Sequence, residues 1–214
     1  MQRVPLALAI AAVVACALCL AEPWFTANVV GTNGAFQMGW EYGLFGGTWT
    51  GPPGPLSPSA HPFVTETLNY SMMPRTVALF AATTGLVSVG GVLGASAVLG
   101  RTRFRHRPRL EAAAPWLSLA AATLLLLAPL MVALFFATAQ AADFQTPAAV
   151  PGFWGTMPYF TMETGEGTEY WGAGMGWYLS AAAGAMLLAA GLLLLRERRQ
   201  PTSVTQEPTR DPAP

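Results

Sequence analysis

Few residues in this 214-residue chain could carry out chemistry, and the first candidates are its two cysteines. Cys16 and Cys19 have the Cys-x-x-Cys spacing that is found in redox and metal sites. Both lie inside an apolar stretch, where the thiolate that such chemistry requires is disfavoured. We therefore interpret them as small packing residues, and we expect no disulfide to hold the other parts of the chain.

A run of carboxylates is the second candidate. Glu163, Glu166 and Glu169 stand among glycines and threonines, and Ca²⁺ binds several oxygen ligands at once. Their spacing matches no established Ca²⁺-binding loop. A solvated acidic turn is therefore the favoured interpretation, and a weak cation site is the alternative.

Enzyme chemistry finds no other support in the sequence. The two histidines lie far apart, His61 in a proline-rich segment and His106 within a run of arginines. The sequence contains no pairing of a nucleophile with a base, no phosphate-binding loop and, apart from Cys16 and Cys19, no metal-ligand spacing. We therefore predict a protein that is not an enzyme and that needs no cofactor.

Four long apolar stretches must position these residues. None of the stretches contains a charged residue, and each approaches or exceeds the roughly 20 residues that an α-helix needs to cross a bilayer. They cover residues 4–21, 76–100, 116–139 and 174–195. The prediction is a four-helix transmembrane bundle over residues 1–199, followed by a disordered tail over residues 200–214.

The first stretch has an alternative interpretation. Arg3 followed by an apolar run is also typical of a cleaved signal peptide, and residues 13–16 loosely resemble a lipoprotein cleavage box. The run continues past Cys16, however, and leads into the aromatic residues Trp24 and Phe25. A retained span is therefore favoured.

Arginine sets the predicted orientation. All 11 basic residues are Arg, and all but Arg75 lie before the first stretch, in the loop 101–115 or after the fourth stretch. Short Arg-bearing loops stay in the cytoplasm, so we expect both termini inside and the loops 22–74 and 140–173 outside the plasma membrane. The arginines from Arg101 to Arg109 should attract anionic lipid headgroups rather than nucleic acid.

The first outer loop carries strand patterns. Asn33-Gly34 is a strong hairpin-turn signal between two segments rich in aromatic and β-branched residues. After this turn large apolar residues recur at every second position, which is typical of a half-buried strand. The four expected strands cover residues 24–30, 35–42, 48–50 and 63–68. We predict that this loop forms a small antiparallel sheet on the outer membrane surface.

The order of these features resembles that of the claudin and peripheral-myelin-protein superfamily. Its members combine four spans with a sheet-forming first outer loop, a Trp directly after the first span, and a later Trp followed by Gly-Leu-Trp. They also carry an Arg at the start of the second span and a Gly-Trp at the start of the fourth. The matching residues here are Trp24, Trp40, Gly43, Leu44, Phe45, Arg75, Gly176 and Trp177. The paired loop cysteines of the family are absent from this chain.

Some of these residues also have a simpler interpretation. Trp and Tyr gather at membrane interfaces because an amphipathic ring suits the headgroup region, and Trp24 and Trp177 could serve only as such anchors. Arg75 is the single cation of the outer loops. We expect it to pair with an outer carboxylate or with carbonyl groups at the base of the sheet, because a bare charge near the bilayer is costly.

Small residues predict close helix packing. Glycines form small faces on the second and fourth apolar stretches, where they would allow helices to approach closely. These glycines are Gly90, Gly94, Gly184 and Gly191. We expect them to serve the protein's own bundle, and we expect Pro129 to kink the third stretch.

The resemblance implies a structural function. Claudin-like proteins associate laterally or between cells through their outer sheet, and we expect this chain to do the same, as a homo-oligomer or with another membrane protein. The alternative is an accessory subunit that modulates a channel, transporter or membrane enzyme, as other members of the superfamily do. A third interpretation, an outer ligand sensor, would require a concave aromatic pocket.

Overall fold

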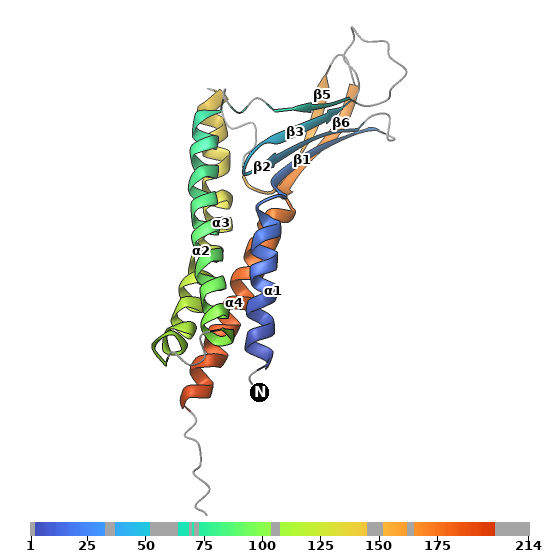
Figure 1. Ribbon diagram of the computed structural model, residues 1–214. Coiled ribbons are helices and arrows are strands. Elements are labelled where there is room, and N and C mark those ends of the chain that lie inside the picture. Colours follow the sequence, from blue (N-terminus) through green and yellow to red (C-terminus); the bar gives the residue numbers. More distant parts are fainter. Residues whose placement is uncertain are drawn as a thin grey trace, which may run out of the picture.

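The computed structural model is a bundle of four helices that carries a β-sheet at one end (Figure 1). It describes residues 3–32, 37–51, 64–68, 70, 73–103, 108–144, 152–161 and 165–199. Several predicted features lie outside the described residues: the Asn33-Gly34 turn, the proline-rich loop from residue 52, both histidines, Glu163 and the tail over residues 200–214.

The helices are long and largely apolar. They are α1 (Arg3–Cys19), α2 (Pro74–Thr102), α3 (Pro108–Phe144) and α4 (Met175–Arg199). Among the described residues, α2, α3 and α4 are long and apolar enough to cross a membrane, whereas α1 is shorter, with 17 residues. Each helix packs on the next in chain order, and α4 also packs on α1. The four helices therefore form a closed bundle.

The third helix is longer than its apolar stretch. α3 begins at Pro108, inside the segment 101–115 that we expected as a loop, and it ends at Phe144. Glu111 lies in its first turn, where a negative charge interacts favourably with the helix dipole. A charged residue ends an apolar stretch in the sequence, but it does not end the helix.

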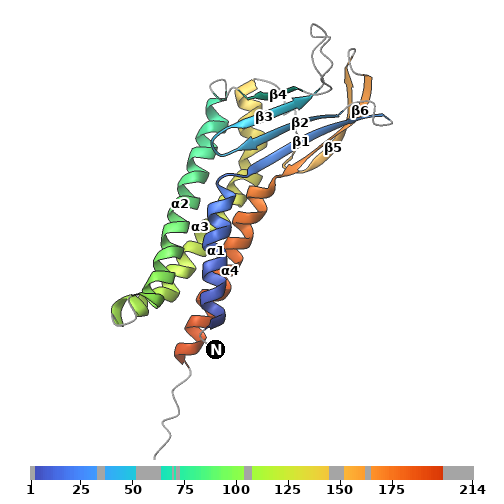
Figure 2. The ribbon, with the colours of Figure 1, turned by 45° about the vertical axis from the view of Figure 1, so that its right-hand side comes forward.

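Six antiparallel strands form a single sheet at the end of the bundle (Figure 2). They are β1 (Pro23–Gly31), β2 (Gln37–Gly43), β3 (Gly47–Gly51), β4 (Val64–Thr67), β5 (Gly155–Thr161) and β6 (Gly165–Ala173), in the order β4-β3-β2-β1-β6-β5. The small antiparallel sheet predicted from the first long connection is confirmed. The second long connection adds β5 and β6 beside β1, and these two strands were not predicted.

Strand register gives the sheet two distinct faces. The bundle-side face carries Phe25 of β1, paired with Tyr42 of β2 and with Ala173 of β6. The far face carries the alternate residues, such as Val30, paired with Thr168. On β2, Met38 and Tyr42 are buried while Gln37 and Glu41 are exposed. The period-two pattern of the second predicted strand is thereby confirmed.

The four glycines predicted to pack helices all lie at contacts between helices. They are Gly90, Gly94, Gly184 and Gly191. A Cβ atom at Gly184 would lie 2.7 Å from Leu126 of α3, and one at Gly90 would lie 2.9 Å from Leu125. Leucine side chains therefore pack directly on the glycine backbone of the neighbouring helix, as close helix packing in membranes requires.

Pro129 frees a carbonyl group in the middle of α3. Proline has no N–H, so the carbonyl of the residue four positions earlier, Leu125, loses its partner within the helix. The hydroxyl of Ser180 on α4, which is fully buried, donates a hydrogen bond of 2.9 Å to the Leu125 carbonyl. α4 thereby satisfies a polar group that would otherwise be costly in an apolar interior.

Pro115 has the same effect near the start of α3. It removes the helical partner of the Glu111 carbonyl. The guanidinium of Arg198 on α4 donates to this carbonyl and, at 3.0 Å, to the carbonyl of Ala112. Both prolines inside α3 are therefore compensated by polar side chains of α4.

Candidate interaction surface

Trp24 joins α1, β1 and α4 where the bundle meets the sheet. Its side chain is fully buried, and its Nε1 donates a hydrogen bond of 2.7 Å to the carbonyl of Cys19, the last residue of α1. A helix C-terminus leaves such carbonyls without an internal partner. Gly176 of α4 makes room for the ring, because a Cβ atom there would lie 2.6 Å from the indole. The structure thus brings two residues of the claudin-like pattern into direct contact.

The two cysteines pack between helices. Both are buried, and both are free thiols. Sγ of Cys16 donates to the Val87 carbonyl of α2 at 3.4 Å, and Sγ of Cys19 donates to the Cys16 carbonyl at 3.1 Å. Buried cysteines behave as small apolar residues with a weak donor, and these contacts agree with the packing interpretation.

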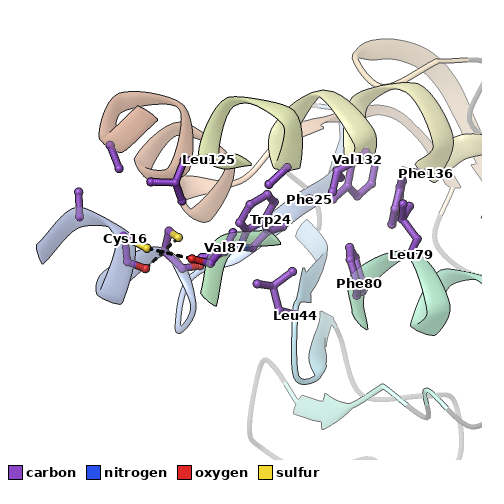
Figure 3. Packing of buried hydrophobic residues seen from close by; sticks show 14 of the residues in the cluster. Cys16, Trp24, Phe25, Leu44, Leu79, Phe80, Val87, Leu125, Val132 and Phe136 are labelled. Carbon is purple, nitrogen blue, oxygen red and sulfur yellow. Dashed lines mark hydrogen bonds between the residues drawn. The ribbon is translucent and has the colours of Figure 1, made fainter. Parts of the chain in front are cut away.

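A cluster of aromatic rings fixes the sheet to the bundle (Figure 3). Phe136 of α3 lies at its centre. The Phe136 ring centroid is 4.2 Å from that of Phe25 on β1, 5.5 Å from Tyr42 on β2 and 5.8 Å from Phe80 on α2. Aromatic pairs at such distances contribute about 0.5–1.5 kcal/mol each beyond the burial of their area. The position of the sheet relative to α2 and α3 is therefore set by tightly packed rings.

The turn between β2 and β3 holds the residues that match the Gly-Leu-Trp of the family. Leu44 is buried, whereas the next residue, Phe45, is 73% exposed. The Gly43 N–H donates to the Gly46 carbonyl at 2.8 Å, and the Gly43 carbonyl accepts a hydrogen bond of 2.9 Å from the Tyr70 hydroxyl. Burial raises the pKa of Tyr70 well above its usual range. Phe45 is thus held at the surface by a rigid turn.

The other two tryptophans of the pattern are half-buried. Trp40 lies on the bundle-side face of β2, directly opposite Trp49 of β3. Nε1 of Trp177, on α4, donates a hydrogen bond of 2.8 Å to the Pro129 carbonyl of α3. Both residues therefore have packing roles within the chain.

Arg75 lies in the first turn of α2, beside the end of α3. The N–H groups of Arg75 and Thr76 donate to the two carboxylate oxygens of Asp143, at 2.9 and 2.8 Å. A carboxylate at a helix N-terminus satisfies N–H groups that have no partner within the helix. A carboxylate therefore lies beside Arg75, but its hydrogen bonds go to the backbone of α2, and the pairing of the Arg75 side chain stays a prediction.

The acidic residues do not converge on a common point. Glu166 and Glu169 both lie on β6. Successive side chains of a strand point to opposite faces, and these two residues are three positions apart. Glu169 therefore belongs to the bundle-side face and Glu166 to the far face. Burial raises the pKa of Glu169. Within the described ranges, no group of three His, Cys, Asp or Glu residues is arranged to hold a metal ion.

Apart from Phe45, the strongly exposed aromatic residues of the sheet lie on or beside its far face and were missed by sequence reasoning. Phe160 of β5 is 67% exposed and Tyr170 of β6 is 49% exposed. Trp154, just before β5, is 53% exposed and covers Gly172, where a Cβ atom would lie 2.6 Å from its ring. We call these three residues, together with Val30 and Pro158, the aromatic stripe. The only sequence pattern that indicates the β5–β6 hairpin is the alternation of Met157 and Tyr159 with Thr156 and Pro158.

The stripe continues onto α4. The ring centroids of Trp154 and Trp177 are 5.5 Å apart, and those of Trp177 and Tyr178 are 5.2 Å apart. Tyr178 is itself 52% exposed. Figure 2 shows that β6 leads directly into α4 and that β5 lies beside β6. An exposed apolar surface of this length is typical of protein–protein contact sites.

No family model matches the sequence, and no curated protein matches it significantly. The resemblance to claudins therefore stays a prediction that depends on the residues given above. The assignment of function depends on the geometry of the chain itself.

Proposed function

We propose that all four helices span a membrane, with the sheet outside the cell. The support is the distribution of arginine. Every described Arg except Arg75 lies at the end of the bundle opposite the sheet, which we call the Arg end. Short Arg-rich connections remain in the cytoplasm, so the two chain termini and the connection between α2 and α3 lie inside.

Within this arrangement the protein acts by binding another membrane protein and not by catalysis. The observation that carries this proposal is the aromatic stripe. Its rings stand exposed on a sheet that is held rigidly by the Phe136 cluster, and exposed aromatic residues on a rigid support are typical of binding hot spots. Little conformational entropy is then lost when a partner binds.

Two kinds of partner fit this function. Self-association, lateral or between cells, is the arrangement that the claudin-like pattern implies. An accessory subunit bound to a different membrane protein is the second candidate. It is favoured by charge, because the exposed surface ends in Glu166 at the sheet and in Arg196 at the Arg end, and like charges would oppose each other in a symmetric pair of copies.

The test is the mass of the complex extracted in native lipid. We expect a particle heavier than the 22.5 kDa chain alone, with either further copies or one foreign protein. Replacing Phe160 and Tyr170 together by Ala should reduce the fraction of the chain in that particle. Phe135→Ala, which removes a similarly exposed ring from α3, is the matched control. A chain that is monomeric under all these conditions would contradict the proposal.

A further inference from the structure

α4 has a face that no other helix of the bundle covers. Ten residues of α4 are exposed, and eight of them recur at alternating steps of three and four along the whole helix. These eight are Met175, Tyr178, Ala182, Ala185, Ala189, Leu192, Arg196 and Arg199, and the other two are Leu188 and Arg198. A spacing of alternating three and four is the heptad pattern by which one helix packs along another.

The chemistry of this face suits a transmembrane helix better than lipid alone. Its middle consists of Ala182, Ala185 and Ala189, which allow a second helix to approach closely. At the end nearer the sheet, Tyr178 contacts Trp177, and Trp177 contacts Trp154 of the aromatic stripe. A partner that lies along α4 would therefore also meet the sheet, so the helix face and the stripe form one continuous surface.

The charges on this surface indicate which kind of partner can bind there. Arg196 and Arg199 are exposed at its Arg end, and within the described part of the chain neither forms an ion pair. A second copy that used the same face would be related by a two-fold axis. That axis would place Arg196 close to Arg196 of the second copy, and such like charges repel.

We infer that the exposed face of α4 binds a transmembrane helix of a different protein, one that carries carboxylates directly beyond its apolar segment at the Arg end. This inference rests on the proposed function and names the kind of partner. The exposed face of α4 packs against the partner helix, and Arg196 and Arg199 favour an acidic helix end. The aromatic stripe binds the part of the partner that stands outside the membrane.

The probe is a synthetic helix in lipid vesicles. It contains about 20 Leu and Ala residues, ends in several Asp residues and carries an acceptor dye. The full-length protein, labelled with a donor dye, is reconstituted in phosphatidylcholine vesicles, and energy transfer reports binding. The same helix with Lys in place of Asp is the charge control. We expect the Asp helix to bind and the Lys helix to bind at least several-fold more weakly.

Three variants locate the binding. Ala185→Phe should weaken binding of the Asp helix by about tenfold, which corresponds to about 1.4 kcal/mol of lost packing. Ala82→Phe, at an exposed position on α2, should leave binding unchanged. Arg196→Glu combined with Arg199→Glu should reverse the preference from the Asp helix to the Lys helix. This last variant tests the inference even where Ala185→Phe fails to fold.

Two results would overturn the inference: equal binding of both helices, or energy transfer between copies of the chain that Ala185→Phe abolishes, since a second copy would then cover the face. If the native complex contains a foreign protein and Ala185→Phe leaves it intact, the inference fails while the proposed function stands. Absence of any native complex contradicts the proposed function itself.

Discussion

At the scale of single residues, the junction between bundle and sheet depends on a fit between an indole and bare backbone. Trp24 fills the space that Gly176 leaves, and its Nε1 satisfies the end of α1. Gly174 makes a second close contact there, because its N–H donates to the Trp24 carbonyl at 3.1 Å. The start of α4 is therefore fixed by contacts to the start of β1.

Gly176→Ala should destabilise the protein. The added methyl group would lie 2.6 Å from the Trp24 ring, and overpacking of this kind costs about 1–3 kcal/mol. Thermal unfolding in detergent micelles measures the effect. Gly85→Ala on α2 is the control, because a Cβ atom there meets nothing within 4 Å. Equal melting temperatures for the two variants would show that the fit at Trp24 does not matter.

Glu169 should make stability depend on pH. Burial raises its pKa in the folded protein, so the folded state holds this proton more tightly than the unfolded state does. The contribution of Glu169 is therefore most favourable when it is protonated. It declines as the pH rises from the ordinary carboxyl pKa through the raised one.

We expect Glu169→Gln to raise the melting temperature at neutral pH and to have less effect at acidic pH. Thermal unfolding of both proteins between about pH 4 and pH 8 provides the measurement. Glu166→Gln, which removes an exposed carboxylate from the opposite face, controls for the loss of one charge. If Glu169→Gln behaves like Glu166→Gln at every pH, burial of Glu169 has no energetic consequence.

At the scale of elements, the contact between α3 and α4 combines two devices. Leucines of α3 pack on the glycine backbone of α4, as Leu126 does on Gly184. Polar side chains of α4 bind the carbonyls that the prolines of α3 leave free, as Ser180 does with Leu125. Apolar packing draws the helices together, and the hydrogen bonds fix how far one helix can slide along the other.

A double-mutant cycle tests this pairing of proline and serine. Ser180→Ala should cost about 1 kcal/mol, because the Leu125 carbonyl loses its partner in an apolar environment. Pro129→Ala restores an N–H to α3, so Ser180→Ala should cost clearly less in that background. Unfolding free energies of the four proteins in mixed micelles give the coupling. Equal costs of Ser180→Ala in both backgrounds would show that Pro129 does not create the need for Ser180.

The elements differ in how well the sequence predicts them. β1 follows from its aromatic and β-branched residues before the Asn33-Gly34 turn. β2 follows from large residues at every second position, because one side of the strand packs on the bundle. β5 and β6 escape the same reasoning. β5 contains Pro158, which lowers the expectation of a strand, and β6 is rich in glycine with Glu169 at a bundle-side position. Apart from Val30 on β1, the aromatic stripe lies on these two strands or directly before β5, so it could not be predicted either.

At the scale of the whole molecule, the first helix decides whether the chain crosses the membrane four times. α1 has 17 residues, which corresponds to about 26 Å of helix. The hydrocarbon core is about 30 Å thick, and a slightly short span is accommodated by local thinning of the bilayer or by snorkelling of flanking residues. Arg3 at its start can reach the headgroups in this way.

The accessibility of single cysteines on intact cells tests most directly whether the four helices cross the membrane with the sheet outside. Arg3→Cys and Thr156→Cys are each introduced after Cys16 and Cys19 are replaced by Ala, and a membrane-impermeant maleimide is added before or after permeabilisation. Thr156 is exposed on the sheet and Arg3 is exposed at the Arg end. We predict that Thr156→Cys is labelled on intact cells and that Arg3→Cys is labelled only after permeabilisation. Labelling of both from outside, or failure of Arg3→Cys to react under either condition, would contradict the four-span arrangement.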